Sequence, residues 1–89
     1  MVVKKSGRRD IIMRNNYYKR IRYLREDHDL SQRALAAKLG MKQAQYCRYE
    51  QGYRDIPTDV LIGIADIFNT STDYILERTD DPSPPRRRR

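Results

Sequence analysis

The sequence predicts an all-α fold, a compact domain of five short helices. Apolar residues recur at spacings of three and four, as on one face of a helix, and do not alternate as in a strand. Residues that commonly begin or end helices, such as Ser31, Gly40 and Ser71, separate these stretches. The chain has 89 residues, enough for one domain with a modest core.

The first helix is predicted over about residues 17–28. One apolar stripe, at spacings i, i+4, i+7 and i+11, defines it. The residues of the stripe are Tyr17, Ile21, Leu24 and His28. His28 also suits a helix C-terminus, where its protonated ring meets the helix dipole. Asp29 follows as a turn residue that tolerates a left-handed backbone.

The second helix is predicted from the cap residue Ser31 through "QRALAAKL". Leu35 and Leu39 form its apolar stripe, and the alanines between them are small enough to let another helix cross closely. Gly40 ends it, because glycine readily adopts the left-handed conformation found after many helices.

The third helix is predicted over about residues 42–51, and Gly52 ends it. At about 100° per residue, positions 42, 45, 46 and 49 share one face. We expect Tyr46 and Tyr49 to face the core from that side. The opposite face, expected to point outward, holds residues 43, 44, 47, 48 and 51.

Two further helices complete the domain. The loop "YRDIPTD" places Pro57 in the first turn of the fourth helix, where its missing N–H costs nothing. The apolar face of that helix consists of Val60, Leu61, Ile64, Ala65 and Phe68. Asn69 ends the fourth helix, and Ser71 caps a short fifth one. The apolar residues of the fifth helix are Tyr74, Ile75 and Leu76.

Charge divides the chain unevenly. We predict a flexible basic N-terminal arm over 1–16, the folded domain over 17–79 and a disordered Pro/Arg-rich tail over 80–89. Within the domain, residues 17–54 carry nine basic and four acidic side chains, whereas residues 55–79 carry one basic and five acidic. A basic half suits a polyanion such as nucleic acid, and chance clustering of surface charge is the alternative.

Several classes of protein do not fit the composition. A single cysteine, Cys47, excludes an internal disulfide and a cysteine-rich zinc site. One histidine, no glycine-rich phosphate loop and scattered carboxylates argue against an enzyme. No apolar run approaches the length of a membrane span, and the start, "MVVKKSGRRD", has no secretion signal. We therefore expect a soluble cytoplasmic protein without cofactor, metal, membrane or small-molecule ligand.

Two helices joined by a tight glycine turn are the geometry by which a helix-turn-helix protein places its second helix in the DNA major groove. Residues 17–77 resemble the Cro and lambda-repressor-like (XRE-type) helix-turn-helix regulators. The resemblance rests on "RIRYLRED", "LSQRALAAKLGMKQAQYCRYEQGYR" and "IPTDVLIGIADIFNTSTDYIL", in the family's order and without gaps. It implies a lambda-repressor-like domain and a sequence-specific regulator, a repressor that binds a double-stranded DNA operator.

The resemblance also implies roles for individual residues. Gln32 matches a position that holds a DNA phosphate and braces the third helix. Positions that match contacts to base edges or adjacent phosphates are Lys42, Gln43, Ala44 and Arg48, with Cys47 beside them. Positions that match contacts to the sugar-phosphate backbone are Gln51, Tyr53 and Arg54. Arg25 and Glu50 match a partly buried ion pair between the first and third helices.

This sequence departs from the family pattern at some positions. Tyr46 replaces the usual aliphatic residue, and Asp29 replaces a common glycine. Ala44 offers only a methyl group, so contact with a thymine methyl is its expected role in place of a hydrogen bond. None of these changes breaks the fold.

Other binding functions stay open as alternatives. A helix-turn-helix fold can serve as a protein-interaction or antitoxin-type module, but such a surface should expose aromatic and aliphatic anchors. RNA binding is a third option, disfavoured because the A-form major groove is too narrow for a helix. A homodimer, at least on DNA, is expected to form through the fifth helix and the loop before it.

Overall fold

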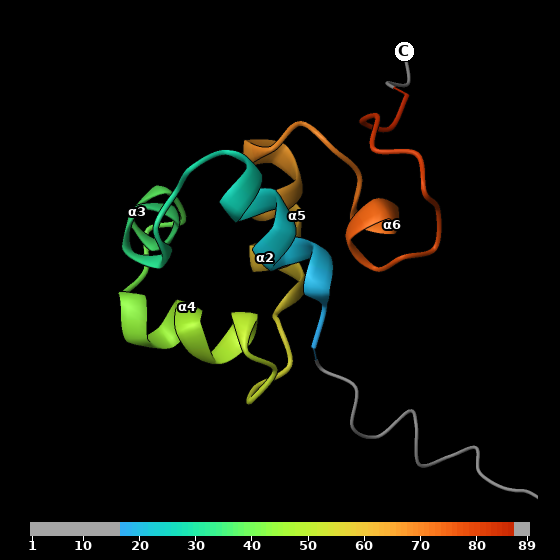
Figure 1. Ribbon diagram of the computed structural model, residues 1–89. Helices are drawn as coiled ribbons and strands as arrows, with labels where there is room; N and C mark the ends of the chain where they lie inside the picture. The colour runs from blue at the N-terminus through green and yellow to red at the C-terminus, as the bar shows by residue number, and fades with distance from the viewer. Residues whose placement is uncertain (1–16, 87–89) are drawn as a thin grey trace, which may run out of the picture.

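The computed structural model describes residues 17–86 and confirms the all-α prediction for this part of the chain, which holds five helices and no strand (Figure 1). The helices are α2 (Lys19–Asp27), α3 (Gln32–Lys38), α4 (Gln43–Glu50), α5 (Thr58–Ile67) and α6 (Thr72–Ile75). The predicted basic arm over 1–16 and the last three arginines lie outside the described residues.

The helix ends follow local sequence signals closely. The hydroxyl of Ser31 accepts a hydrogen bond from the backbone N–H of Ala34 at 2.9 Å, and Ser71 caps α6 in the same way. Gly40 has a φ of 73° directly after α3, and Asp29 and Asn69 adopt left-handed conformations after α2 and α5. These predictions are confirmed.

Two element boundaries differ from those predicted. Pro57 lies one residue before α5 because its ψ of 150° is extended, although its φ of −64° would fit a helix. Tyr17 precedes α2 and is 45% exposed, so it does not extend the buried stripe of Ile21 and Leu24. At the other end His28 is exposed, and its ring lies against Phe68 with centroids 4.7 Å apart.

One buried cluster holds the helices together, and every helix contributes to it. Its members are Ile21, Leu24, Leu35, Ala36, Tyr46, Ile56, Ile64, Ala65, Phe68 and Ile75. Tyr46 is fully buried, as predicted, and Tyr49 is half-buried against the cluster. Since α4 packs mainly against α3 and α2, its third side is left open toward α5.

This open side corrects the predicted core face of α4. Gln45 and Lys42 were expected on the same side as Tyr46, yet both are exposed. The physical reason is a hollow between α4 and α5, lined by Gln45 and Tyr49 on one side and Val60 and Gly63 on the other. None of the five described helices fills that space, so only part of the predicted face is covered.

The chain after α6 curves around that helix (Figure 1), and its first residues contact Arg20 of α2. The guanidinium of Arg20 donates to the carbonyl oxygens of Tyr74 and Thr79 at 2.9 and 2.7 Å and to the carboxylate of Asp80 at 2.7 Å. It also stacks over the Tyr74 ring, 4.2 Å from the centroid. Further along, the buried Thr70 hydroxyl donates to the carbonyl of Pro82 at 2.6 Å. These contacts hold the first part of the Pro/Arg-rich segment against the domain.

Candidate nucleic-acid interface

Helices α3 and α4 form a closely packed pair joined by a short turn (Figure 1). The turn is closed by hydrogen bonds of 3.0 Å from the N–H groups of Leu39 and Met41 to the carbonyl of Ala36. The Ala36 side chain, which is 1% exposed, is small enough to lie inside the core beside this turn. The arrangement is that of a helix-turn-helix unit, in which the second helix presents its outer face to solvent.

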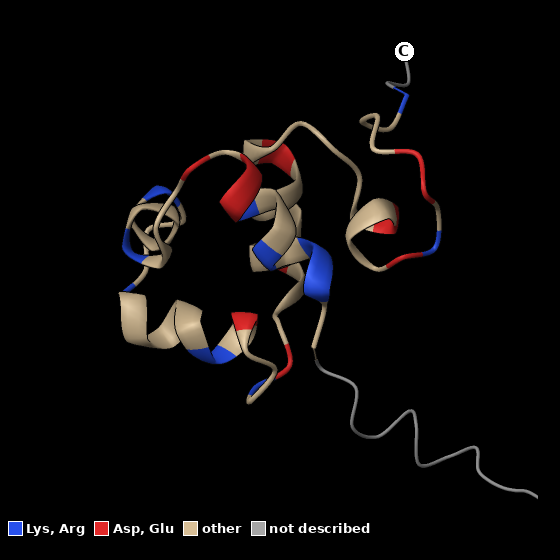
Figure 2. Cartoon of the chain, viewed as in Figure 1, with Lys and Arg blue, Asp and Glu red and all other residues tan. Residues whose placement is uncertain are grey.

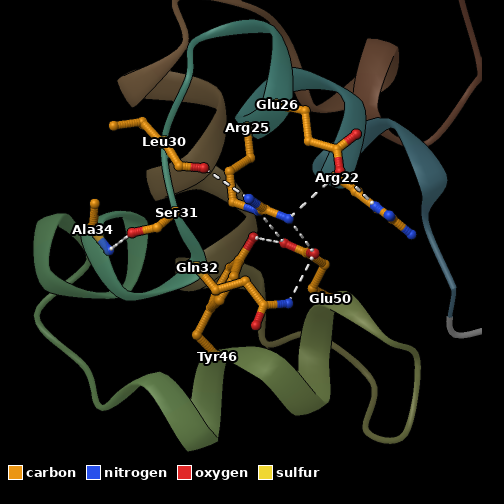
Figure 3. Close-up of polar contacts among 9 residues, drawn as sticks. All are labelled: Arg22, Arg25, Glu26, Leu30, Ser31, Gln32, Ala34, Tyr46 and Glu50. Carbon is orange, nitrogen blue, oxygen red and sulfur yellow. Dashed lines mark hydrogen bonds and ion pairs between the residues drawn. The ribbon is translucent and has the colours of Figure 1, made fainter.

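A buried carboxylate fixes α4 to both of its neighbours (Figure 3). Glu50, which is 3% exposed, accepts hydrogen bonds from Arg25 Nε at 2.9 Å and Arg25 Nη2 at 3.0 Å. It also accepts from Gln32 Nε2 at 3.1 Å and from the Tyr46 hydroxyl. Because these donors come from α2, α3 and α4, one side chain sets how the three helices meet.

The charge of Glu50 is stabilised despite its burial. Burial alone would raise the pKa of Glu50, but hydrogen bonds from Arg25, Tyr46 and Gln32 hold that pKa below its ordinary value. Burial and the neighbouring carboxylate raise the pKa of Tyr46, so its hydroxyl stays protonated and donates. The remaining terminal nitrogen of Arg25 donates a hydrogen bond to the carbonyl oxygen of Leu30 at 2.7 Å. The network is therefore satisfied and exposes no net negative charge.

Most residues matched to DNA contacts lie on the exposed side of α4 or just after it. The exposed ones are Lys42, Gln43, Ala44, Arg48, Gln51, Tyr53 and Arg54. Cys47 is half-buried, and Tyr53 is 76% exposed. Gln32 differs from the others, because it is half-buried at the start of α3 and one amide hydrogen is already donated to Glu50.

A hollow along α4 gathers several of these side chains. It is lined by Lys42, Ala44, Gln45, Arg48, Tyr49 and Arg54. Three of the six are cations and none is acidic. Gln45 belongs to this surface but was missed by the sequence reasoning. The signal available in the sequence was that glutamine is polar, which favours an exposed position for Gln45 even though its neighbour Tyr46 is buried.

The cations of this region have no ionic partners among the described residues. Between residues 30 and 54 the basic side chains are Arg33, Lys38, Lys42, Arg48 and Arg54. All ion pairs formed within residues 17–86 involve other cations. Glu50 is the sole acidic residue of the same stretch, and it is buried. Figure 2 shows α3 and most of α4 free of acidic positions, in contrast to α5 and the chain after α6.

The described residues form neither a metal-binding cluster nor a membrane-spanning helix. Over residues 17–86, no group of histidine, cysteine and acidic side chains has the arrangement needed to hold a metal ion. None of the five helices is long and apolar enough to cross a membrane.

Comparison with known proteins agrees with this geometry. A helix-turn-helix family model matches residues 21–75. The uncharacterized HTH-type transcriptional regulator YobD of Bacillus subtilis (strain 168) is 41% identical over 76% of this chain. From the same organism, the HTH-type transcriptional regulator ImmR is 34% identical over 70% of the chain, and the uncharacterized HTH-type transcriptional regulator YqaE is 38% identical over 60%. The aligned regions cover 61%, 49% and 46% of these relatives. No solved structure matches significantly.

Proposed function

Because this chain belongs to the XRE-type helix-turn-helix family, we propose that it is a sequence-specific, double-stranded DNA-binding transcriptional regulator. In this proposal α4 enters the major groove, and α3 lies across its mouth. The protein acts by binding, without a catalytic step or a cofactor, in the cytoplasm.

One observation carries the proposal: the stretch from residue 30 to residue 54 offers no exposed carboxylate and five cations that form no ion pair with any residue of 17–86. DNA phosphates supply the missing negative charge, and release of their counterions drives association. A protein-binding surface of the same size would need aromatic and aliphatic anchors at its centre. Here the exposed side of α4 offers glutamine, arginine and lysine.

The exposed residues divide by the part of DNA that they suit. Gln43, at the N-terminal end of α4, can both donate to and accept from the edge of adenine. Ala44 suits a thymine methyl group, and Arg48 suits a guanine edge or a neighbouring phosphate. The residues assigned to the sugar-phosphate backbone are Lys42, Gln51, Tyr53 and Arg54, with Gln32 at the start of α3. Cys47 lies beside these base-contacting residues as a small, half-buried side chain.

We propose that the protein regulates transcription by occupying its operator. A bound protein excludes RNA polymerase from an overlapping promoter and so represses transcription. Two copies bind one operator as a homodimer through α6 and the loop before it, which places the two α4 helices in successive major grooves.

The test is selection of binding sites from random duplex DNA, followed by anisotropy titration at two salt concentrations. We expect a recurring operator that is bound at least about a thousandfold more tightly than unrelated DNA. The logarithm of the binding constant should fall linearly with the logarithm of salt concentration, by about 0.9 per phosphate contact. Failure to enrich any sequence, together with capture of a specific protein partner through α4, would favour the protein-interaction alternative.

A further inference from the structure

The segment that follows α6 lies against the folded domain (Figure 1). We call its residues 79–86 the strap. Arg20 holds the start of the strap through two hydrogen bonds of 2.7 Å, one to a backbone carbonyl and one to the carboxylate of Asp80. The hydroxyl of Thr70, in the loop between α5 and α6, holds the middle by donating to the carbonyl oxygen of Pro82 at 2.6 Å. Two separate anchors therefore fix the path of the strap.

Beyond these anchors the strap reaches a hollow on the face formed by α5 and α6. Pro85 of the strap lines this hollow together with Ile62, Ala65 and Asp66 of α5 and with residues 70–73. Ile62 is 47% exposed, and it is the only exposed large aliphatic side chain within residues 17–86. The strap therefore covers one edge of this face and leaves an aliphatic side chain open beside it.

The strap is held weakly enough to be displaced. All its side chains from residue 81 to residue 86 are exposed. Asp80 is 94% exposed, and an ion pair with so exposed a carboxylate contributes little to stability. Further hydrogen bonds, from the backbone N–H groups of Asp81 and Ser83, stay within the strap. A segment with few buried contacts opens at a small cost in free energy.

The strap also lies on the surface through which a second copy is proposed to bind, which is α6 and the loop before it. Thr70 belongs to that loop and bonds to the strap, and Pro85 lies beside the first residues of α6. One surface cannot hold the strap and a second copy together. An operator with two half-sites holds two copies at a high effective concentration, which favours the contact between them.

We propose that the strap is an autoinhibitory segment that competes with a second copy of the chain for the face formed by α5 and α6. This inference rests on the proposed function, and in particular on the proposed homodimer. In the free protein the strap occupies the face and the chain is monomeric. On an operator with two half-sites the second copy displaces the strap. The strap thus confines the dimer to DNA.

The main experiment measures self-association of the free protein by sedimentation equilibrium for the unaltered chain and for Thr70→Val. The variant removes the hydroxyl that bonds to Pro82 and changes neither the charge nor the arginines of the tail. Loss of this hydrogen bond should open the strap about twofold to tenfold more often. In a two-fold symmetric dimer both copies must open, so the association constant should rise by the square of that factor while the strap is mostly closed.

The matched control for this variant is Thr72→Val. It makes the same substitution at the first residue of α6, beside the same hollow but outside the contact with Pro82. It should leave self-association unchanged. Equal tightening by Thr70→Val and Thr72→Val would mean that added apolar surface is the cause, and this would overturn the inference.

A second variant releases the other anchor and leaves the face itself unaltered. Asp80→Ala removes the carboxylate that pairs with Arg20 and should open the strap up to about fivefold more often, because an exposed pair is weak. Asp81→Ala removes the same charge from the next residue, whose carboxylate accepts a hydrogen bond from Ser83 within the strap. This control should have a smaller effect.

Trypsin cleavage after Arg78, directly before the strap, reports opening independently, since cleavage follows the open population when opening is fast. Cleavage should be faster in Thr70→Val and Asp80→Ala, and circular dichroism establishes that each variant is folded. Unchanged cleavage, or faster cleavage without tighter self-association, would overturn this inference alone. Absence of two-copy binding on every selected operator would overturn the proposed homodimer and this inference with it. Absence of operator binding by the unaltered chain would overturn the proposed function.

Discussion

The basic side chains on the two ends of the domain have different surroundings. In α2 and the segment after α6, Lys19 pairs with Glu77, Arg20 with Asp80 and Arg78 with Asp73. The five cations between residues 30 and 54 have no such partner among the described residues. Both regions contain arginine and lysine, so composition does not distinguish them.

This difference shows that the availability of a charge matters more than its count. The charge of an arginine beside a carboxylate is already compensated, so a DNA phosphate must compete with that carboxylate for the arginine. A cation without a partner gains its first one when DNA binds. The surface for a polyanion is thus better located by unpaired cations than by the net charge of +7.

The largest effect is expected at the Arg25–Glu50 ion pair, which joins the two regions. Arg25→Ala and Glu50→Ala should each lower the free energy of unfolding by about 1 to 3 kcal/mol, because the first leaves the buried Glu50 and the second the half-buried Arg25 without its ionic partner. The double variant should cost less than the sum of the two. Urea unfolding of all four proteins measures this, and strict additivity would contradict the coupling.

The next prediction distinguishes residues that recognise bases from residues that contact the DNA backbone. Gln43→Ala should weaken binding to the preferred operator by about 1 to 3 kcal/mol and relax discrimination at one or two base positions in each half-site. Gln32→Ala should lower binding to matched and mismatched sites by similar factors. Both variants are titrated against the operator and its single-base variants at fixed salt. A Gln32 variant that loses specificity while the Gln43 variant keeps it would show that the reading residue is wrongly assigned.

A smaller effect contrasts one free arginine with one engaged arginine. Arg48→Gln should reduce the salt slope of DNA binding by about 0.9 and leave thermal stability unchanged. Arg20→Gln should do the reverse, since its guanidinium holds Tyr74, Thr79 and Asp80 against α2. Melting curves and salt titrations on both variants give four results. The contrast between the regions fails if Arg20→Gln also changes the salt slope.

The smallest effect is a dependence of stability on pH. The pKa of Glu50 is lower in the folded protein than its ordinary value of 4.5, so its stabilisation is complete above that value and is lost as pH falls toward the folded value. One such group changes the free energy of unfolding by at most about 1.4 kcal/mol per pH unit. Glu50→Gln should be less stable than the unaltered chain at pH 7, and this difference should shrink below pH 4.5. A constant difference down to pH 3 would contradict it.

Local features of the fold could be predicted from the sequence because their causes are local. Ser31, Gly40 and Ser71 act on the backbone within three or four residues, so the helix boundaries they define follow from chemistry readable along the chain. The burial of Tyr46 followed from the helical period. These features depend little on how distant segments meet.

Features that depend on distant segments could not be predicted. The period of α4 assigned Gln45 to the core, but burial requires a neighbouring helix, and α5 leaves that space open. The contacts of Arg20 with Tyr74, Thr79 and Asp80 join residues 54 to 60 positions apart. The helical spacing of apolar residues gives no information about contacts between such distant residues. The hollow lined by Arg22, Gln32 and Glu50 likewise forms only where α2, α3 and α4 converge.

The burial pattern of α4 has a practical consequence for redesign. Within this eight-residue helix, Tyr46 and Glu50 are buried and Tyr49 packs half-buried against the core, and these three side chains hold the helix in place. The exposed positions take no part in that support, so their side chains can be exchanged as a cassette. A library that varies Gln43, Ala44 and Arg48 while keeping Tyr46 and Glu50 should yield folded proteins with new operator preferences. The same domain could then serve as a scaffold for orthogonal repressors.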